Sequence, residues 1–297
     1  MKSGFIGLIG RPNVGKSSLV NAVIGHKVAI TSDKPQTTRN VIQGIRTDED
    51  SQMVFVDTPG IHKPKNKLGR ILNKEAYYSL EDVDVILFLV DITESLGKGD
   101  KFVIDVLKNA NVPIILVINK IDKVPREEIL KKIDEYRDLY NFDEIIPISA
   151  KKMDNVDRLI NVLKSKLTDN IKYYDEDMYT DKPVNFMVSE LIREKILDLT
   201  FEEVPHSVSV IVDAMEYSAN SVNIQATIVV DRENLKAILV GKNGSMIKEI
   251  GTRARMEIEL LLNKKVYLEL FVKVIPKWRD REKFLNEIGY EEYNFDK

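Results

Sequence analysis

The chain has 297 residues, of which 43% are hydrophobic and 31% are charged, and its formal net charge is −3. This length suits about two domains of a globular protein. The absence of cysteine excludes disulfides and thiolate metal sites, and three scattered histidines argue against a histidine metal cluster. We expect no signal segment, and no apolar run approaches the roughly 18 residues that span a bilayer. These features predict a cytosolic protein, at most peripheral on a membrane.

Charge is distributed unevenly along the sequence. Residues 236–281 contain 11 lysines and arginines and 5 acidic residues, so this part carries +6 and the remainder carries −9. A basic stretch in an acidic chain indicates that one end of the protein faces an anionic partner.

Residues 4–168 alternate strand-like apolar runs with amphipathic stretches. The predicted strands are Phe5–Gly10, Val41–Thr47, Met53–Asp57, Val85–Asp91, Ile114–Asn119 and Ile145–Ser149. The predicted helices are Lys16–Ile24, Asn66–Leu80, Lys101–Lys108, Arg126–Tyr140 and Val156–Leu167. This alternation predicts an α/β fold with a doubly wound, mainly parallel sheet, whose ligands bind beyond the carboxyl ends of the strands. We therefore expect a first domain over residues 1–168.

Residues 169–183 lack helical periodicity, and we interpret them as an interdomain linker. The remaining residues, 184–297, predict a smaller α+β domain with a polar C-terminal tail that contains Trp278. Its predicted elements are helix Phe186–Leu199, strand Ser207–Tyr217, strand Val222–Val230, helix Asn234–Val240, loop Gly241–Gly244, helix Ser245–Leu262 and strand Lys265–Ile275.

A phosphate-binding loop is predicted between the first strand and the first helix. The pattern G-x-x-x-x-G-K-S in this context wraps phosphates with backbone N–H groups at the helix N-terminus. Lys16 would contact the β- and γ-phosphates, and Ser17 would ligate Mg²⁺. The residues of this loop are Gly10, Arg11, Pro12, Asn13, Val14, Gly15, Lys16, Ser17 and Ser18.

A Mg²⁺ and γ-phosphate sensor is predicted where the third strand ends, at Asp57, Thr58, Pro59, Gly60 and Ile61. The Asp57 carboxylate would hold Mg²⁺ through water, and the Gly60 N–H would detect the γ-phosphate. The polar loop 34–39 would supply a threonine that reaches Mg²⁺ only in the triphosphate state. We favour Thr38 for this role and keep its neighbour Thr37 open.

A guanine clamp is predicted at the ends of two later strands, at Asn119, Lys120, Ile121 and Asp122 and at Ser149, Ala150 and Lys151. A carboxylate at Asp122 can accept hydrogen bonds from guanine N1–H and the exocyclic amine. Adenine lacks this donor pair, so Asp122 argues against ATP as the ligand.

Phosphoryl transfer to water depends mainly on positioning and charge neutralisation. Ile61 stands where many GTPases carry a water-orienting glutamine, so we expect slow intrinsic GTP hydrolysis. Lys16, Thr38 and Gly60 are the predicted catalytic residues. Asn13 is a further candidate because it could hold K⁺ against the phosphates, although a turn-forming role explains it equally well.

The second domain carries G-x-x-G between two helices, within the basic stretch. Two close glycines let a nucleic-acid backbone approach, and Lys242 favours phosphate. The order of elements is typical of a KH domain with two strands before the loop (type II), which binds about four nucleotides of single-stranded RNA. The predicted RNA-binding residues are Gly241, Lys242, Asn243, Gly244, Ser245 and Lys248. Trp278 could stack on a base, but we favour its packing within the domain.

This arrangement of motifs resembles the bacterial Era GTPases over essentially the whole chain. The matching segments are Gly-Arg-Pro-Asn-Val-Gly-Lys-Ser at 10–17, Gln-Thr-Thr-Arg at 36–39, Asp-Thr-Pro-Gly-Ile-His-Lys-Pro at 57–64, Asn-Lys-Ile-Asp at 119–122 and Val-Gly-Lys-Asn-Gly-Ser at 240–245. The resemblance implies assembly of the small ribosomal subunit, through binding of the 3′ end of its ribosomal RNA under the control of GTP. It also implies peripheral association with the inner membrane. We expect a monomer, since nothing in the sequence indicates an obligate interface.

Two other functions are compatible with the same motifs. One is a membrane-associated GTPase switch that links growth to cell division, with the basic end facing anionic lipid. Against it, the sequence shows no basic amphipathic helix of the membrane-surface type and no lipidation motif. The other is a passive RNA-binding module whose nucleotide site only stabilises the fold.

Overall fold

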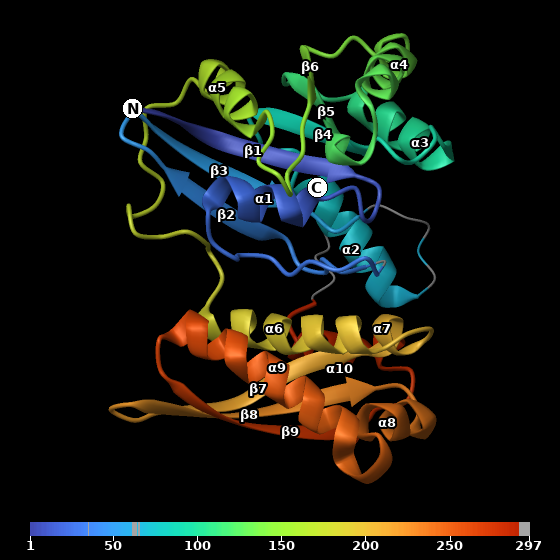
Figure 1. Ribbon diagram of the computed structural model, residues 1–297, viewed down its shortest axis with the longest axis vertical. Coiled ribbons are helices and arrows are strands. Elements are labelled where there is room, and N and C mark those ends of the chain that lie inside the picture. The colour runs from blue at the N-terminus through green and yellow to red at the C-terminus, as the bar shows by residue number, and fades with distance from the viewer. Residues whose placement is uncertain (35, 61–63, 65, 291–297) are drawn as a thin grey trace. The chain divides into compact units, whose positions relative to one another are not determined.

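The computed structural model describes residues 1–34, 36–60, 64, 66–290 of the chain (Figure 1). They form two compact units, Met1–Lys63 with Leu72–Asp181 and Pro64–Ile71 with Lys182–Lys297. Among the described residues, no helix is long and apolar enough to cross a membrane.

The first unit is built on a six-stranded sheet with the order β2-β3-β1-β4-β5-β6, in which only β2 runs antiparallel to its neighbour. Its strands are β1 Lys2–Gly10, β2 Ile42–Thr47, β3 Ser51–Asp57, β4 Val85–Asp91, β5 Ile114–Asn119 and β6 Glu144–Pro147. Its helices are α1 Lys16–Ile24, α3 Lys98–Leu107, α4 Arg126–Arg137 and α5 Val156–Lys166, with the 3₁₀ turn η1 at Ile121–Lys123. Helix α2 spans Lys67–Tyr78, and its part from Leu72 onward belongs to this unit. The predicted α/β class and mainly parallel sheet are confirmed.

Both faces of this sheet are covered by helices. Side chains of α1 and α5 pack on one face, and those of α3 and α4 pack on the other together with Ala76 of α2. All seven positions of β3 and of β4 are buried for this reason, which explains the apolar runs at residues 53–56 and 85–90. The five parallel strands therefore end at one edge of the sheet, where their carboxyl-terminal residues meet.

Residues 169–181 form an irregular strap along this sheet. Thr180 pairs with Gly44 of the edge strand β2, and the Ile45 N–H donates to the Tyr179 carbonyl at 3.0 Å. The Asp181 carboxylate accepts the Gln43 N–H at 2.9 Å. The sequence predicts a linker here, but in the structure these residues belong to the first unit. An edge strand exposes unpaired backbone groups, and the strap satisfies part of them.

The second unit has a three-stranded sheet with the order β7-β8-β9, antiparallel between β7 and β8 and parallel between β8 and β9. Helices α6, α8 and α9 cover one face of it (Figure 1). Their apolar side chains pack in one core with the even-numbered residues of β8. The strands are β7 Ser209–Tyr217, β8 Ser221–Val230 and β9 Lys265–Val274. The helices are α6 Val184–Leu199, α7 Val204–Ser207, α8 Glu233–Val240, η2 Lys242–Gly244, α9 Ser245–Leu262, η3 Trp278–Asp280 and α10 Glu282–Glu287.

The segment after β9 is more ordered than the predicted polar tail. Trp278 is fully buried, its indole N–H donates to the Ser207 carbonyl at 2.9 Å, and its ring packs edge-on against Phe284. Leu285 of α10 is also fully buried. Trp278 therefore packs within the domain, as the favoured interpretation of the sequence expects.

Candidate nucleotide site and nucleic-acid interface

The predicted phosphate loop connects β1 to α1 and encloses the Lys16 side chain. Gly15 has φ 100°, and a Cβ atom there would lie 2.2 Å from the Asn119 amide nitrogen. The Lys16 Nζ donates to the carbonyls of Gly10 at 3.1 Å and Arg11 at 3.2 Å. Burial lowers the Lys16 pKa to about 8, although the nearby Asp57 opposes this effect. A buried ammonium at a helix N-terminus is suited to bind an anion.

Three oxygen-bearing side chains meet at the expected Mg²⁺ position. The Ser17 hydroxyl donates to Asp57 Oδ2 at 2.6 Å and lies 2.8 Å from the Thr38 hydroxyl. Thr37 instead donates to the Lys34 carbonyl at 2.6 Å, so Thr38 is the threonine that approaches Ser17. The structure thus brings together the three residues predicted as metal ligands, one from each of three separate segments.

The Asp57 carboxylate is fully buried, and its Oδ1 atom has no hydrogen-bond partner among the described residues. Burial raises the Asp57 pKa to about 6, while Lys16 and the hydroxyls of Ser17 and Thr38 oppose the rise. An unpaired buried carboxylate oxygen beside two hydroxyls fits a divalent cation, because hard cations such as Mg²⁺ take oxygen ligands.

The segment after Asp57 continues along the phosphate loop. Thr58 is buried and donates to the Leu8 carbonyl at 2.7 Å. A Cβ atom on Gly60 would lie 3.0 Å from the Pro12 Cα, so glycine allows this close approach of the two loops. Ile61 and its neighbours His62 and Lys63 lie outside the described residues, as does Pro35 of the 34–39 loop.

The predicted guanine clamp is assembled around Asn119. Its amide donates to the Val14 carbonyl at 2.9 Å, and its Oδ1 accepts the N–H groups of Lys120 at 2.8 Å and Ala150 at 3.1 Å. Asn119 therefore joins the phosphate loop to both clamp motifs. The Lys120 Nζ in turn donates to the Asn13 carbonyl at 2.7 Å.

Asp122 lies exposed beyond the end of β5, on the turn that follows Asn119. Its Oδ1 accepts a hydrogen bond from the Ser149 hydroxyl at 2.5 Å, and this bond lowers the Asp122 pKa. The Ile121 N–H donates to the Ile148 carbonyl at 3.2 Å, which fixes the turn next to the end of β6. The exposed, ionised carboxylate is available to a base, while Lys151 is exposed at the rim.

Two predicted loop residues have side chains engaged elsewhere. The Arg11 guanidinium pairs with Asp100 at 3.2 Å, so only its backbone is free to face the phosphates. Asn13 has φ 65°, and its amide donates to the Asp33 carbonyl at 2.7 Å. The left-handed backbone agrees with a turn-forming Asn13, and the K⁺ role stays a prediction.

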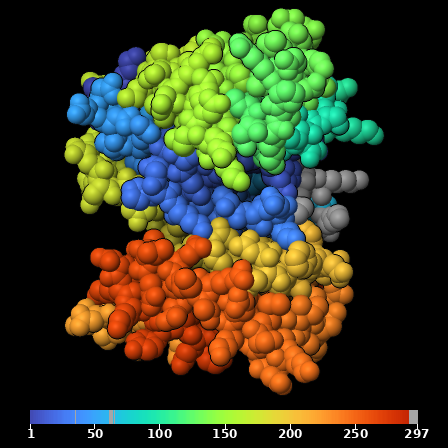
Figure 2. Space-filling model, viewed as in Figure 1, coloured from blue at the N-terminus to red at the C-terminus, as the bar shows by residue number. Residues whose placement is uncertain are grey.

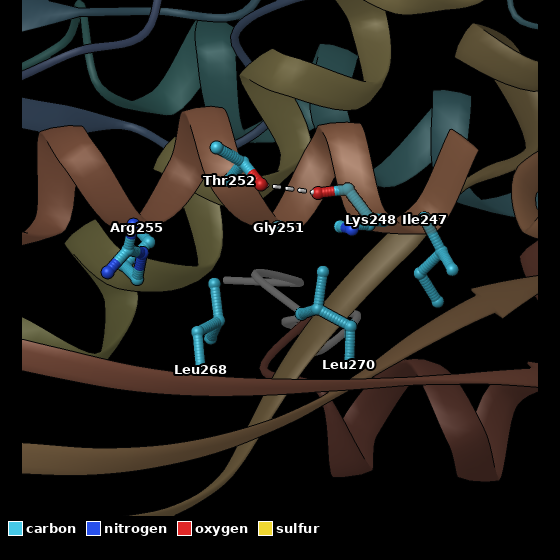
Figure 3. A pocket seen from close by; sticks show the side chains of 7 residues that line it. All are labelled: Ile247, Lys248, Gly251, Thr252, Arg255, Leu268 and Leu270. Atoms are coloured by element: carbon cyan, nitrogen blue, oxygen red, sulfur yellow. Dashed lines mark hydrogen bonds between the residues drawn. The ribbon is translucent and has the colours of Figure 1, made fainter. Parts of the chain in front are cut away.

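The second unit contains a groove of about 310 Å³ between α9 and β9 (Figure 3). Leu268 and Leu270 of β9 form one wall, and the charged residues of the other wall are Lys248 and Arg255. The lining residues are Ile247, Lys248, Gly251, Thr252, Arg255, Leu268 and Leu270. Apolar walls with two cations suit stacked bases and a phosphate backbone.

The G-x-x-G loop lies between α8 and α9. Gly241 and Gly244 have φ 72° and 77°, and Asn243 between them has φ 53°. Lys242, Asn243 and Ser245 are exposed, and the surface of α9 lies open on the side shown in Figure 2. The loop thus presents the predicted RNA-binding residues to solvent.

Known proteins resemble the chain in both units. Residues 5–120 match the family model of a 50S ribosome-binding GTPase, and residues 203–279 match that of a KH domain. A crystal structure of Era in complex with MgGDPNP and nucleotides 1506–1542 of 16S ribosomal RNA is 43% identical. The match covers 98% of this chain and 100% of that one, with a TM-score of 0.95. A variant of Aquifex aeolicus Era bound to GDP·AlF4⁻ matches with the same identity and coverage and a TM-score of 0.93.

The chain belongs to the Era family of GTPases. The resemblance stated from the sequence motifs is confirmed, as is the combination of a P-loop GTPase with a C-terminal KH domain. As an Era-family protein it binds guanine nucleotide with Mg²⁺, hydrolyses GTP and binds RNA.

One residue of this Era-family nucleotide site is absent from the motifs used above. Asp91, the last residue of β4, is 6% exposed, and its Oδ2 lies 2.5 Å from the Lys120 Nζ. Thr93 donates its N–H and its hydroxyl to the Asp91 Oδ1. The sequence contains one indication of this role, which is the position of Asp91 at the end of a buried strand. Asp57 and Asn119 occupy the same position on their own strands.

Two lining residues of the KH groove, Thr252 and Arg255, are absent from the residues predicted to bind RNA. They lie on the same helical face as Lys248, with Thr252 four and Arg255 seven residues further along α9. The helical period of 3.6 residues could have identified them once Lys248 was chosen.

Proposed function

We propose that this Era-family protein is a GTP-controlled assembly factor of the small ribosomal subunit, and that it binds the 3′ end of small-subunit ribosomal RNA. The proposal rests on two features of the same chain. Ser17, Thr38 and Asp57 come together at the expected Mg²⁺ position, and the KH unit has a groove lined by cations. Because the nucleotide site and the RNA interface belong to one chain, the bound nucleotide can control the affinity for RNA.

The relatives favour the small subunit over the large one. The family model that mentions the 50S particle covers residues 5–120 alone. The Era structure with a 16S ribosomal RNA segment matches 98% of this chain, including the RNA-binding unit. Since RNA contacts are expected in the KH unit, the match that includes it is the more informative one.

In the proposed hydrolysis, the backbone N–H groups of residues 10–18 bind the phosphates, and the Lys16 ammonium neutralises charge on the β- and γ-phosphates. Ser17, Thr38 and Asp57 would hold Mg²⁺, which when bound neutralises charge on the transferred phosphoryl group. Thr38, whose hydroxyl lies 2.8 Å from that of Ser17, would bind Mg²⁺ when GTP is present and would thereby couple its loop to the nucleotide state. Gly60 would donate its N–H to the γ-phosphate.

Base recognition in this proposal depends on the clamp residues. The Asp122 carboxylate accepts guanine N1–H and the exocyclic amine, while the stem of Lys120 lies on the ring face. A backbone N–H of residues 149–151 would donate to the guanine O6. Asn119 positions these groups through its three hydrogen bonds.

Intrinsic turnover should be slow, because Ile61 cannot orient a water molecule. If Asn13 holds K⁺ against the phosphates, replacing K⁺ by Na⁺ will slow GTP hydrolysis by the wild-type chain and not by Asn13→Ala. Equal rates in both salts would remove the K⁺ role and leave Asn13 as a turn residue.

RNA would bind along the groove between α9 and β9, with a phosphate over residues 241–245 and with Lys248 beside the backbone. We place the nucleotide-binding part at residues 1–168 and the RNA-binding part at residues 184–297. We further propose a cytoplasmic protein with a fraction peripheral on the inner face of the cell membrane. Cell fractionation with a high-salt wash of the membranes tests this location.

The test of the proposed function is the affinity of the full chain for a short RNA that copies the 3′ end of small-subunit ribosomal RNA. Affinity is compared with GDP and with a non-hydrolysable GTP analogue at one salt concentration, because phosphate contacts make it salt-dependent. Tighter binding with the analogue supports the proposal. Equal affinity in both states would show that nucleotide does not control RNA binding.

A further inference from the structure

The KH unit has a second hollow, on the opposite face of its sheet. It also has a volume of about 310 Å³, and its lining includes Ala214 and Glu216 of β7, Asn223 and Gln225 of β8, and Tyr267 and Glu269 of β9. In the strand register, Asn223 pairs with Glu216 and Tyr267, while Gln225 pairs with Ala214 and Glu269. All these residues therefore point to the face that α6, α8 and α9 leave uncovered.

The two hollows differ in the sign of their charge. The charged lining residues of the groove between α9 and β9 are Lys248 and Arg255, whereas those of the second hollow are Glu216 and Glu269. Carboxylates repel a phosphate backbone and attract cations. The same domain thus offers a cationic groove on one face and an anionic hollow on the other.

The anionic hollow also contains an accessible aromatic ring. Tyr267 is 63% exposed, and Phe271, on the same face of β9 just beyond Glu269, is 53% exposed. A guanidinium can stack on such a ring while it pairs with a carboxylate, so an aromatic residue beside carboxylates suits arginine.

The carboxylates are held at separate positions around the hollow. The Gln225 amide donates to Glu269 Oε2 at 3.0 Å, which orients that carboxylate. Glu216 and Glu269 lie on the two outer strands, two strand spacings apart across β8 and offset by two residues along it, or roughly 12 Å apart. A cationic side chain that lies over Asn223 and Gln225 would have a carboxylate on each side.

The cations on the same row of β9 lie farther away. Lys265 and Lys273 are each four residues from Glu269, or about 13 Å along an extended strand. Asp213, which accepts a hydrogen bond from Thr227 at 2.7 Å, adds a third carboxylate to this face. The centre of the face is therefore anionic although its ends are not.

We infer that the open face of the β7-β8-β9 sheet docks an arginine-rich, extended segment of a partner protein. This inference adds a protein interface to the proposed function. It rests on the proposed function in one respect, the assignment of RNA to the cationic groove. Because the two hollows lie on opposite faces of one sheet, the protein could hold RNA and a basic polypeptide at the same time.

The test uses the full chain with GDP and a short fluorescein-labelled peptide of alternating arginine and serine. Fluorescence anisotropy gives its affinity for the wild type, for Glu216→Gln/Glu269→Gln and for Tyr267→Ala. The matched control is Glu127→Gln/Glu128→Gln on α4, which changes net charge equally at exposed positions. A peptide with glutamate in place of arginine tests charge selectivity.

We expect the double variant to bind the arginine peptide roughly tenfold more weakly and Tyr267→Ala to weaken it as well, with no change in the α4 control. Equal weakening in the α4 control would show attraction to general negative charge and would overturn the inference, as would unchanged binding in the double variant. Affinity for the 3′-end RNA is measured in parallel and should be unchanged. Loss of RNA affinity with retained peptide affinity would assign this face to RNA instead.

Discussion

The Asp91 carboxylate and the Lys120 ammonium form an ion pair with 2.5 Å between Oδ2 and Nζ, next to the guanine clamp. The lysine donates to the Asn13 carbonyl as well, so its Nζ is fixed between the end of β4 and the phosphate loop. The hydrogen bonds with Lys120 and Thr93 keep the Asp91 pKa below its ordinary value despite burial. These two contacts hold the Lys120 side chain in place before the nucleotide arrives.

Asp91→Asn should accelerate dissociation of GDP and of GTP by a similar factor, roughly tenfold, because the base contact made by Lys120 is common to both. The dissociation rate of a fluorescent guanine nucleotide measures this. Asp105→Asn, at an exposed ion pair on α3, is the control and should change nothing. An unchanged rate for Asp91→Asn would mean that Asn13 alone suffices to position Lys120.

Asp122→Asn should exchange the base preference of the site. An amide at this position no longer accepts two hydrogen bonds from guanine, but its N–H can donate to the 2-oxo group of xanthine. We expect GTP affinity to fall about a hundredfold or more and XTP affinity to rise. Titration with both nucleotides decides this, and a variant that lost GTP without gaining XTP would contradict the predicted base contact.

Asp57→Asn should make the nucleotide-free chain more stable at pH 7 while it weakens Mg²⁺-dependent GTP binding. Because the pKa of this buried carboxyl is about 6, the folded chain binds a proton between about pH 4 and pH 6 that the unfolded chain does not bind. The contribution of the Asp57 carboxyl to the free energy of unfolding therefore decreases as the pH rises from about 4 to about 6. The gain from asparagine should be on the order of 1–3 kcal/mol above pH 6.

Thermal melts of the wild type and Asp57→Asn at pH 4.5, 6 and 7.5 check the sign. The difference in Tm should grow with pH. If the variant is less stable than the wild type at every pH, the Asp57 charge is compensated in the folded chain and the predicted penalty does not exist.

Lys248→Ala and Arg255→Ala should each weaken binding of the 3′-end RNA and reduce the dependence of log affinity on log salt by about one. Lys273→Ala, on the open face of the sheet, removes the same charge outside the groove and serves as the control. Equal effects at all three positions would indicate that RNA responds to overall charge and does not occupy this groove.

Sequence patterns predicted α1, β4, β5 and α9 with the bounds that the structure has. In each case continuous apolar positions or flanking glycines mark the ends. The Mg²⁺ ligands could be predicted because each motif has its own local signature. The contact of Asp91 with Lys120 could not, since it joins residues 29 positions apart that share no motif. Helix α10 is only six residues long, too short for a clear helical period.

The strap over residues 169–181 has a consequence for how the protein can be divided. A fragment that ended at residue 168 would remove the partners of Gln43, Gly44 and Ile45 and leave β2 as a bare edge, which invites pairing between molecules. Extending the fragment to Asp181 keeps that edge closed. The point where the GTPase part can be separated is therefore set by backbone hydrogen bonds on its outermost strand, well beyond its last helix.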